Sequence, residues 1–375
     1  MHQEIEWIEA IVPDMIEVMS RRYTILKNVA WQEPVGRRSL AQTLGMSERV
    51  LRTETDLLRK YELISSTKSG MILTDKGHKT ILGLSAFMDS LLGIQQLEKE
   101  LSKKLGIARC LVVPGNCDDN GKVVDAMGKI VTDTLKTLLP LGKNIIAAMG
   151  GTTMACVATC LTSEIAEGRE LLFVPARGGV GERVDIQANN VCAQMALCTG
   201  GSHRSLYVPE QVSETTFKTL LKEPAVQDVV ELIEHSNAVL HSIGEALHMA
   251  NRRSMSDKQI ELLKSRKAVG EAFGYFFDED GKVVYKIPRV GLQLKDLASM
   301  NCIIAVAGGV SKAKAIAAYM HHAPSQTYLV TDEGACRDPA IASSFMTSPS
   351  ARLKPPHVRD FLVYNGRQST KARKG

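Results

Sequence analysis

Apolar and polar positions follow two different rhythms along this 375-residue chain, and the change of rhythm divides it. In the first hundred or so residues apolar side chains recur every three or four positions, which is the spacing of amphipathic helices. From Ile107 onward, short apolar runs end in small or polar residues and are each followed by a helical pattern. The patterns predict four segments: a helical domain at 1–77, a connecting helix at 78–106, a larger domain at 107–345 and a tail at 346–375.

Two short helical patterns surround a glycine in the stretch RRSLAQTLGMSERVLRTETDLLRKYELI, residues 37–64. The first helix is predicted from Ser39 to Leu44, and Gly45 suits the left-handed conformation of a tight turn. Ser47 is placed to cap the second helix. The apolar stripe predicted for that helix consists of Val50, Leu51, Leu57 and Leu58. Helix, glycine turn and helix form the pattern in which a second helix enters the DNA major groove.

The segment LISSTKSGMILT, residues 63–74, predicts two short strands around a Ser-Gly turn. A hairpin directly after a recognition helix is typical of the wing of a winged helix-turn-helix domain. An arginine fork can hold guanine O6 and N7 together, so we expect Arg49 and Arg52 at base edges and the other cations at the DNA backbone. The predicted DNA-binding residues are Arg37, Arg38, Ser47, Arg49, Arg52, Thr53 and Lys68. An ordinary helical pair with solvated arginines is the alternative.

No proline interrupts the stretch from His78 to Gly106, and Glu98 breaks its apolar seam. The seam consists of Leu84, Phe87, Leu91, Ile94, Leu101 and Leu105. We expect one long amphipathic helix that packs either on its twin in a second copy or on the larger domain of its own chain. Because one winged module rarely reads a site alone with useful affinity, a homodimer or homotetramer on a repeated site is expected.

Six apolar runs in the larger domain predict strands that are buried on both faces of an open, mostly parallel, Rossmann-like α/β sheet. The runs are CLVVPGN, NIIAAMGG, LLFVPARGG, AVLHSIGEA, CIIAVAGGVS and TYLVTDEGA. In such sheets ligands bind at the carboxyl ends of the strands, so the loops there are the place for a site.

Three of these strand-end loops carry groups that bind anions. GGTT at 150–153 opens a helix, so backbone N–H groups, two hydroxyls and a positive dipole end converge there. Arg177 precedes Gly178 and Gly179 at the next strand end, and AGGVSKAKAIAAY places Ser311 near a helix N-cap with Lys312 in its first turn. Each loop alone is explained by a tight turn, but together they predict a phosphorylated ligand.

Known nucleotide motifs do not match these loops. The chain has no G-x-G-x-x-G after a first strand with an acid about 20 residues on, and no G-x-x-x-x-G-K-[ST]. NAD and ATP are therefore not expected, and no cofactor is predicted.

The basic residues are unevenly distributed along the chain. The chain has a net charge of +5. Seven Lys or Arg and one Asp follow residue 350, so this tail carries +6 and the first 350 residues together carry −1. We expect this tail to be disordered, adding weak attraction to nucleic acid or nothing. Between Arg21 and Lys60 nine basic and four acidic residues give a further +5, which coincides with the helix-turn-helix pattern. No apolar run approaches the roughly 20 residues of a membrane span, and a bacterial cytoplasmic location is expected.

Eight cysteines lie mostly within apolar segments and never form a C-x-x-C pair. They are Cys110, Cys117, Cys156, Cys160, Cys192, Cys198, Cys302 and Cys336. Small buried thiols in a reducing compartment are the interpretation, and no metal site is expected.

Several stretches together resemble the SorC family of sugar-responsive bacterial repressors. They are EPVGRRSLAQTLGMSERVLR, GMILTDKG, MGGTT, RELLFVPARGGVGE, EAFGY, IIAVAGG and LVTDEGA, and they reach from the N-terminus to about Arg337. The resemblance implies a winged helix-turn-helix domain and an effector domain similar to sugar-phosphate isomerases and deaminases. It also implies fructose-1,6-bisphosphate as an effector that weakens cooperative binding to an operator ahead of glycolytic genes. The basic tail extends beyond the family's usual end.

Carried onto this chain, the resemblance implies one set of effector contacts, of which Gln187, Arg252 and Glu271 rest on it alone. The set is Gly151, Thr152, Thr153, Arg177, Gly179, Gln187, Arg252, Glu271 and Lys312. The alternatives are a sugar-phosphate isomerase or deaminase that carries a DNA-binding domain, and a structural DNA-bridging protein. Since no His with an adjacent acid occurs in the strand-end loops, and a bridging protein needs no anion loops, a sensor without catalytic residues is expected.

Overall fold

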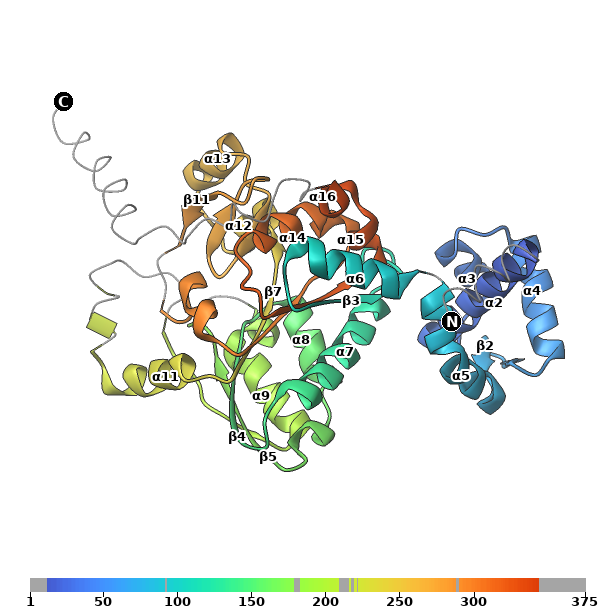
Figure 1. Cartoon of the computed structure of the whole chain (residues 1–375), viewed down its shortest axis with the longest axis horizontal. Helices are drawn as coiled ribbons and strands as arrows, with labels where there is room; N and C mark the ends of the chain where they lie inside the picture. The colour runs from blue at the N-terminus through green and yellow to red at the C-terminus, as the bar shows by residue number, and fades with distance from the viewer. Residues whose placement is uncertain are drawn as a thin grey trace.

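The computed structural model describes residues 12–91, 93–178, 183–208, 216, 219, 220, 222–287 and 290–343. It contains a small N-terminal unit and a larger α/β unit, joined by two helices (Figure 1). Both predicted fold classes are confirmed in these residues. The predicted tail at 346–375 and Gly179 lie outside them. Among the described helices, none is both long enough and apolar enough to span a membrane.

The N-terminal unit is a winged helix-turn-helix. Its elements are α2 (Pro13–Gln32), α3 (Arg37–Thr43), α4 (Glu48–Lys60), β1 (Ile64–Ser66) and β2 (Met71–Leu73). Gly45 has φ +61° between α3 and α4, as a left-handed turn requires, and the antiparallel hairpin pairs Ser65 with Ile72. The hairpin packs tightly on the strand-like residue Val35, because a Cβ at Gly70 would lie 2.8 Å from the Val35 backbone.

The buried face of α4 differs from the predicted stripe. Leu51, Glu54, Thr55 and Leu58 are buried at helical spacing, whereas Val50 is 41% exposed. The prediction that Val50 points inward is therefore wrong. Residues three or four positions apart share a helix face, and Val50 lies next to Leu51 in the sequence and outside this spacing. The buried Glu54 carboxylate is paired with two arginines of α2, at 2.8 Å from Arg22 Nε.

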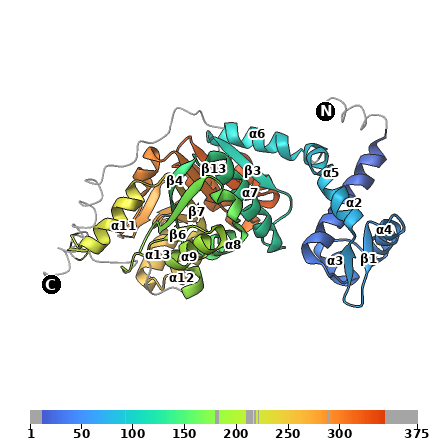
Figure 2. The ribbon, with the colours of Figure 1, turned by 90° about the horizontal axis from the view of Figure 1, so that it is seen from below.

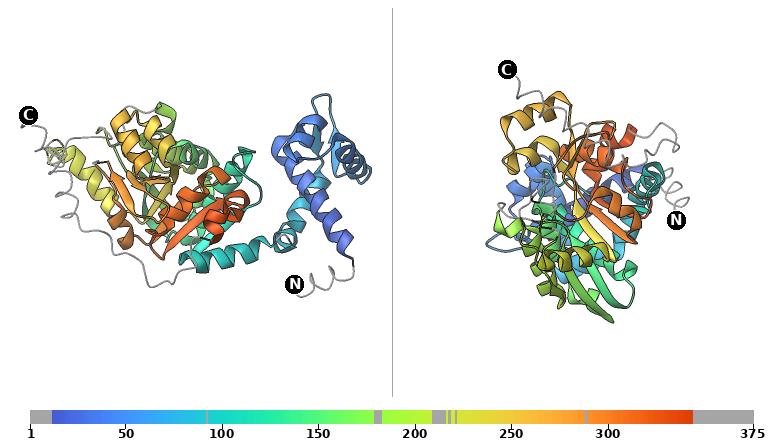
Figure 3. Two further views of the ribbon diagram at one scale, coloured as in Figure 1. Left: turned by 90° about the horizontal axis from the view of Figure 1, so that it is seen from above. Right: turned by 90° about the vertical axis from the view of Figure 1, so that its left-hand side faces the viewer.

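The connecting segment is two helices and not the one long helix predicted. α5 (Asp75–Leu91) and α6 (Ile94–Leu105) are separated at Gly93, whose φ of +71° ends the helical path. α5 packs on α2 of the N-terminal unit, and α6 lies on the larger unit (Figure 3). Glu98 Oε1 accepts a hydrogen bond of 2.7 Å from Val112 N–H on the edge of the sheet, which explains the carboxylate within the apolar seam.

The larger unit is built on a seven-stranded parallel sheet in the order β3-β13-β12-β7-β4-β5-β6. All six predicted runs form strands of this sheet, and β6 was not predicted. The strands are β3 (Arg109–Val113), β4 (Gly142–Ala148), β5 (Arg169–Pro175), β6 (Ser202–His203), β7 (Ala238–Ser242), β12 (Cys302–Val306) and β13 (Thr327–Asp332).

Helices cover both faces of the sheet (Figure 2). One face packs on α7 (Lys122–Leu138), α8 (Thr152–Cys160) and α9 (Ala188–Thr199). The other face packs on α6, α11 (Pro224–Glu234) and α14 (Ala313–Met320). The remaining short elements of this unit are η1 (Ser163–Ala166), η2 (Val184–Ile186), η3 (Leu294–Ser299), η4 (Val310–Lys312), α15 (Glu333–Arg337) and α16 (Pro339–Ser343). Burial on both faces explains why the strands read as continuous apolar runs.

A second sheet, which the sequence patterns did not predict, is inserted between β7 and β12. It is antiparallel in the order β11-β10-β9-β8 and is accompanied by two helices with their own small core. Its elements are β8 (Gly244–Glu245), α12 (Ala246–Arg252), α13 (Asp257–Ser265), β9 (Gly270–Ala272), β10 (Tyr275–Phe277) and β11 (Val283–Lys286). The insertion brings residues after β7 back over the strand ends.

Candidate functional site

The strand order creates a topological switch point between β4 and β7. β4 is followed by α8 and its neighbour β5, whereas β7 is followed by the inserted sheet and its other neighbour β12. The connections therefore leave these two adjacent strands in opposite directions. Ligands of open α/β sheets bind outside the carboxyl ends of strands at such a switch point.

Gly151, at the start of α8, lies at this switch point and is approached closely from β7 and α12. A Cβ on Gly151 would lie 3.5 Å from Ser242 Oγ and 3.9 Å from Arg252 Nη1. Its φ of +123° also suits glycine alone. Thr152 is exposed and Thr153 half-buried in the first turn, where helix geometry leaves N–H groups without intrahelical acceptors. Arg252 thus brings a guanidinium to the positive end of α8, an arrangement suited to an anion.

Gln187 lies on the other side of the same loop. It is the N-cap of α9, and a Cβ on Gly150 would lie 2.5 Å from Ile186 O and 2.9 Å from Ala188 N. Gly151 N–H also donates to Ile186 O at 2.8 Å. The start of α9 is therefore held against the GGTT loop, and the backbone of Gln187 lies beside that loop through contacts that local sequence did not indicate.

Glu271 is held inside the inserted sheet. Its backbone pairs with Gly244 of β8, its Oε1 accepts from Gly274 N–H at 2.6 Å, and its Oε2 lies 3.1 Å from Arg253 Nη1. Both side chains of the ion pair are nearly fully buried. The pair fixes the end of α12 and thereby the position of the neighbouring Arg252.

Arg177 is buried at the end of β5 and forms an antiparallel bridge with Gly291. Leu292 N–H donates to Ala176 O at 2.8 Å, and Gly178 N–H donates to Val290 O at 3.2 Å. The strand end is thus joined to the segment before η3.

The glycine loop after β12 differs from the expected anion site. Ser311 donates to Asp118 through both its N–H, at 2.8 Å, and its hydroxyl, at 2.7 Å. Gly309 N–H donates to Asp332 Oδ2 at 2.7 Å. The helix proper begins only at Ala313, so Lys312 lies in the 3-10 turn that precedes it and not in the first turn of α14 as predicted. The chain's own carboxylates therefore occupy the groups expected to receive an anion, and Lys312 remains half-buried beside them.

Sequence reasoning missed Asp118 and Asp332. Asp118 lies in the loop that follows β3, and Asp332 is the last residue of β13. The acids in the runs NCDDN and TDEGA were the available signal. Which neighbouring loop these carboxylates reach depends on strand order, which no local pattern reveals.

The loop after β3 also faces the N-terminal unit. Asn116 Oδ1 accepts from Val310 N–H at 3.4 Å, so one side of this loop touches the glycine loop of β12. Its other side borders a cavity of about 400 Å³. Across that cavity Thr24, Asn28 and Trp31 of α2 face Asn116, Asp119 and Arg337. Trp31 also packs against the core of the larger unit.

The predicted DNA-binding residues lie on α3, on α4 and at its N-cap, and in the turn of the hairpin. Arg49, Arg52 and Thr53 are exposed on α4, and Ser47 caps that helix by accepting from Val50 N–H at 3.3 Å. Helix α3 begins at Arg37 and not at Ser39 as predicted. Arg37 and Arg38, the predicted contacts to the DNA backbone, therefore belong to its first turn. Lys68 is exposed in the turn of the hairpin. Acidic neighbours accompany the cations, since Arg52 Nε lies 3.8 Å from Asp56 Oδ2 and Arg38 Nε 3.7 Å from Glu48 Oε1.

Comparisons with known proteins agree with this two-part organisation. Residues 18–88 match the family model described as "CggR N-terminal DNA binding domain". Residues 89–338 match the model described as "Putative sugar-binding domain". The chain is 43% identical over 337 residues to the central glycolytic genes regulator of Bacillus subtilis (strain 168), covering 90% of this chain and 98% of that protein. It is 41% identical to the protein of the same name from Priestia megaterium, again over 90% of this chain and 98% of the relative.

Solved structures of transcriptional regulators are also similar to this chain. A crystal structure described as "putative SorC family transcriptional regulator from Enterococcus faecalis" is 57% identical, with a TM-score of 0.62 over 65% of this chain and 98% of that one. The full-length sorbitol operon regulator SorC of Klebsiella pneumoniae covers 86% of this chain and 98% of its own at a TM-score of 0.58, and at 15% identity it shares the fold. The relatives are regulators, which confirms the expectation of a regulator over an enzyme. This chain belongs to the SorC family of transcriptional regulators, within its group of central glycolytic genes regulators.

Proposed function

We propose that this protein represses glycolytic genes. Fructose-1,6-bisphosphate, bound at the switch point between β4 and β7, weakens the cooperative binding of the protein to its operator. One observation carries the proposal: Arg252 Nη1 lies 3.9 Å from the position that a Cβ would take at Gly151. It combines a fixed cation with a helix N-terminus at the switch point of the sheet. The similarity to central glycolytic genes regulators over 98% of their length supports the choice of target genes, and the choice of ligand follows the family resemblance.

One phosphate of the ligand binds at the start of α8, to Gly151, Thr152, Thr153 and Arg252. Backbone N–H groups, two hydroxyls and a bidentate guanidinium match the oxygens of a phosphate dianion. Gln187, at the N-cap of α9, binds the sugar in this proposal.

The second phosphate is bound by cations at the ends of β5 and β12, the strands on either side of β4 and β7. Arg177 and Gly179 follow β5, and Lys312 precedes α14. Glu271 contributes through the sugar hydroxyls and through Arg253, which it holds beside Arg252. A bisphosphate therefore draws together loops that belong to different strands.

The loop after β3 transmits binding to the DNA-binding unit. Asp118 is bonded to Ser311, next to Lys312, while Asn116 and Asp119 of the same loop line the cavity that Trp31 borders. A phosphate near Lys312 competes with the Asp118 carboxylate for the same donors. The loop then shifts, and the placement of α2 changes. A ligand moves such an equilibrium only by its differential affinity for the two states.

On DNA, Arg49 and Arg52 read base edges from α4, with Thr53 on the same helix face and Ser47 at the N-cap of the helix. Arg37, Arg38 and Lys68 neutralise phosphates, and the protein binds as a homodimer or homotetramer in the bacterial cytoplasm. Two or more copies are needed because a single winged module reads too few base pairs for useful affinity.

The test uses the full chain and an operator obtained by in vitro selection from random DNA. Fluorescence anisotropy measures operator binding with and without fructose-1,6-bisphosphate, while calorimetry measures ligand binding directly. We expect a steep, cooperative DNA isotherm that shifts to higher protein concentration with the ligand. Glucose-6-phosphate and dihydroxyacetone phosphate, which carry one phosphate each, serve as matched controls. An unshifted isotherm with bound fructose-1,6-bisphosphate contradicts the proposed regulation, and no heat contradicts the proposed ligand.

A further inference from the structure

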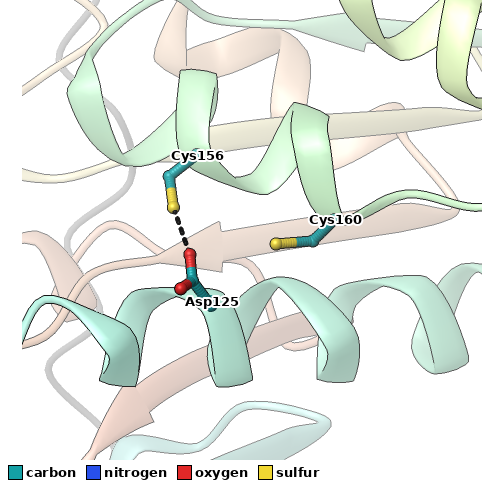
Figure 4. Close-up of side chains that lie close together, drawn as sticks. All are labelled: Asp125, Cys156 and Cys160. Atoms are coloured by element: carbon teal, nitrogen blue, oxygen red, sulfur yellow. Dashed lines mark hydrogen bonds between the residues drawn. The ribbon is translucent and has the colours of Figure 1, made fainter. Parts of the chain in front are cut away.

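Asp125 of α7 and Cys156 and Cys160 of α8 form a cluster on the side of the sheet opposite α6 (Figure 4). The Cys156 thiol donates to Asp125 Oδ1 at 3.0 Å. One carboxylate oxygen and the two sulfur atoms all lie within 4.8 Å of one another. All three residues are half-buried.

The backbone is shaped to bring these groups together. Cys156 and Cys160 are four residues apart and therefore share one face of α8. That face meets α7 at Gly128, where a Cβ would lie 2.6 Å from Cys160 Cβ and 2.7 Å from its Sγ. Glycine in the middle of a helix costs about 1 kcal/mol relative to alanine, and here it admits the Cys160 side chain against α7.

The donor set selects a class of ion. Two thiolates and a carboxylate are ligands of Zn²⁺, which accepts sulfur and oxygen in a tetrahedral arrangement and keeps an open position in three-ligand sites. Thiolates select against Mg²⁺ and Ca²⁺, which prefer oxygen.

We propose that Asp125, Cys156 and Cys160 bind one Zn²⁺ ion, with water as the fourth ligand. Binding replaces the two thiol protons, which pass to the solvent, and forms two Zn–S bonds and one Zn–O bond. The ion links α7 to α8, the helix whose first residues, Thr152 and Thr153, belong to the proposed phosphate site. The assignment itself is independent of that site and of the proposed function.

The experiment titrates Cd²⁺, a spectroscopic substitute for Zn²⁺, into the reduced, chelator-treated full chain. Thiolate-to-cadmium charge transfer gives an ultraviolet band, and we expect it to saturate at one equivalent and to disappear when Zn²⁺ displaces the probe. Cys156→Ser and Cys160→Ser each lose most of the band. Asp125→Asn keeps the size of the side chain and weakens binding about tenfold or more, on the scale of a lost metal-ligand interaction.

Cys198→Ser is the matched control. Cys198 is a half-buried free cysteine of the same unit, on α9, where its sulfur accepts from Gln194 at 3.1 Å. This variant keeps the full band. Circular dichroism and thermal melting of each variant verify the fold.

A second measurement on the unmodified chain does not depend on how the variants fold. Iodoacetamide alkylation followed by peptide mass spectrometry is expected to show that Zn²⁺ protects Cys156 and Cys160 and leaves Cys198 reactive. Equal protection of Cys198, a band retained in both serine variants, or no band in the unmodified chain overturns the assignment. Formation of a Cys156–Cys160 disulfide with no Zn²⁺ binding by the reduced protein also overturns it.

Discussion

Arg253 Nη1 lies 3.1 Å from Glu271 Oε2, with only 3% and 4% of the two side chains exposed. Removing one partner from such a pair leaves a buried charge poorly compensated. The carboxylate therefore supports the end of α12 as well as belonging to the proposed ligand site.

Glu271→Gln is expected to lower the free energy of unfolding by about 3–5 kcal/mol in urea denaturation. Glu261→Gln is the matched control, because its pair with Lys264 at 2.9 Å is 70% and 52% exposed. The control should cost less than about 1 kcal/mol. Equal small losses in both variants contradict a structural role for Glu271.

Lys312→Ala is expected to weaken binding of fructose-1,6-bisphosphate by roughly 1.5–3 kcal/mol, the range for a hydrogen bond to a charged group. Operator binding without ligand should stay unchanged, because Lys312 lies in the larger unit. Lys314→Ala, two residues on, provides the control: the Lys314 side chain is 64% exposed and its ammonium is paired with Glu279 at 2.7 Å. Calorimetry measures the ligand and anisotropy the operator. Loss of both activities in Lys312→Ala argues against separate sites.

Asp118→Asn is expected to raise the affinity for the bisphosphate several-fold, because it removes a negative charge bonded beside Lys312. At a few ångströms in a partly solvated site, that charge is worth on the order of 1 kcal/mol. Asp119→Asn is the neighbouring control, since the Asp119 carboxylate accepts from Asn116 at 2.8 Å and does not bond Ser311. If both variants bind the ligand like the parent protein, Asp118 does not compete with phosphate.

Arg52→Ala is expected to weaken operator binding by about 1–3 kcal/mol and to relax specificity at one base pair, since a bidentate base contact has that value. The effector affinity should not change. Arg204→Ala removes an exposed arginine from the larger unit and should leave DNA binding intact. Normal operator binding by Arg52→Ala would mean that α4 is not the recognition helix.

His241 should make stability depend on pH. It is fully buried against Phe273 and Tyr319, and burial lowers its pKa from 6.5 to about 4. Above pH 6.5 the imidazole is neutral in folded and unfolded chains. As pH falls from 6.5 toward 4, the unfolded chain binds the proton first, so the free energy of unfolding falls by up to about 3 kcal/mol.

Urea denaturation at several pH values measures this loss. The carboxylates of the protein titrate in the same range, so the quantity of interest is the difference between the parent protein and His241→Gln. The variant should be less sensitive to pH between 6.5 and 4. Parallel pH profiles for the two proteins would exclude His241 as a source of the dependence.

The sequence by itself determined the parts that depend on near neighbours. Gly45 and Ser47 specify a turn and a helix cap within three residues, and the six apolar runs specify strands buried on both faces. These signals are local because a backbone conformation or a side-chain cap involves only adjacent turns of chain. Some local predictions failed: the apolar periodicity of the connecting segment hid the break at Gly93, and the stripe predicted for α4 placed Val50 inward.

Only the tertiary structure decided which of these parts meet. The order of the strands places β4 beside β7, and so brings Arg252 to Gly151 across a hundred residues of sequence. The same order lets Asp118 fill the donors of Ser311 and sets Asp125 against two cysteines. Contacts between distant segments leave no periodicity in the chain, because they are selected by the packing of the whole sheet and its helices.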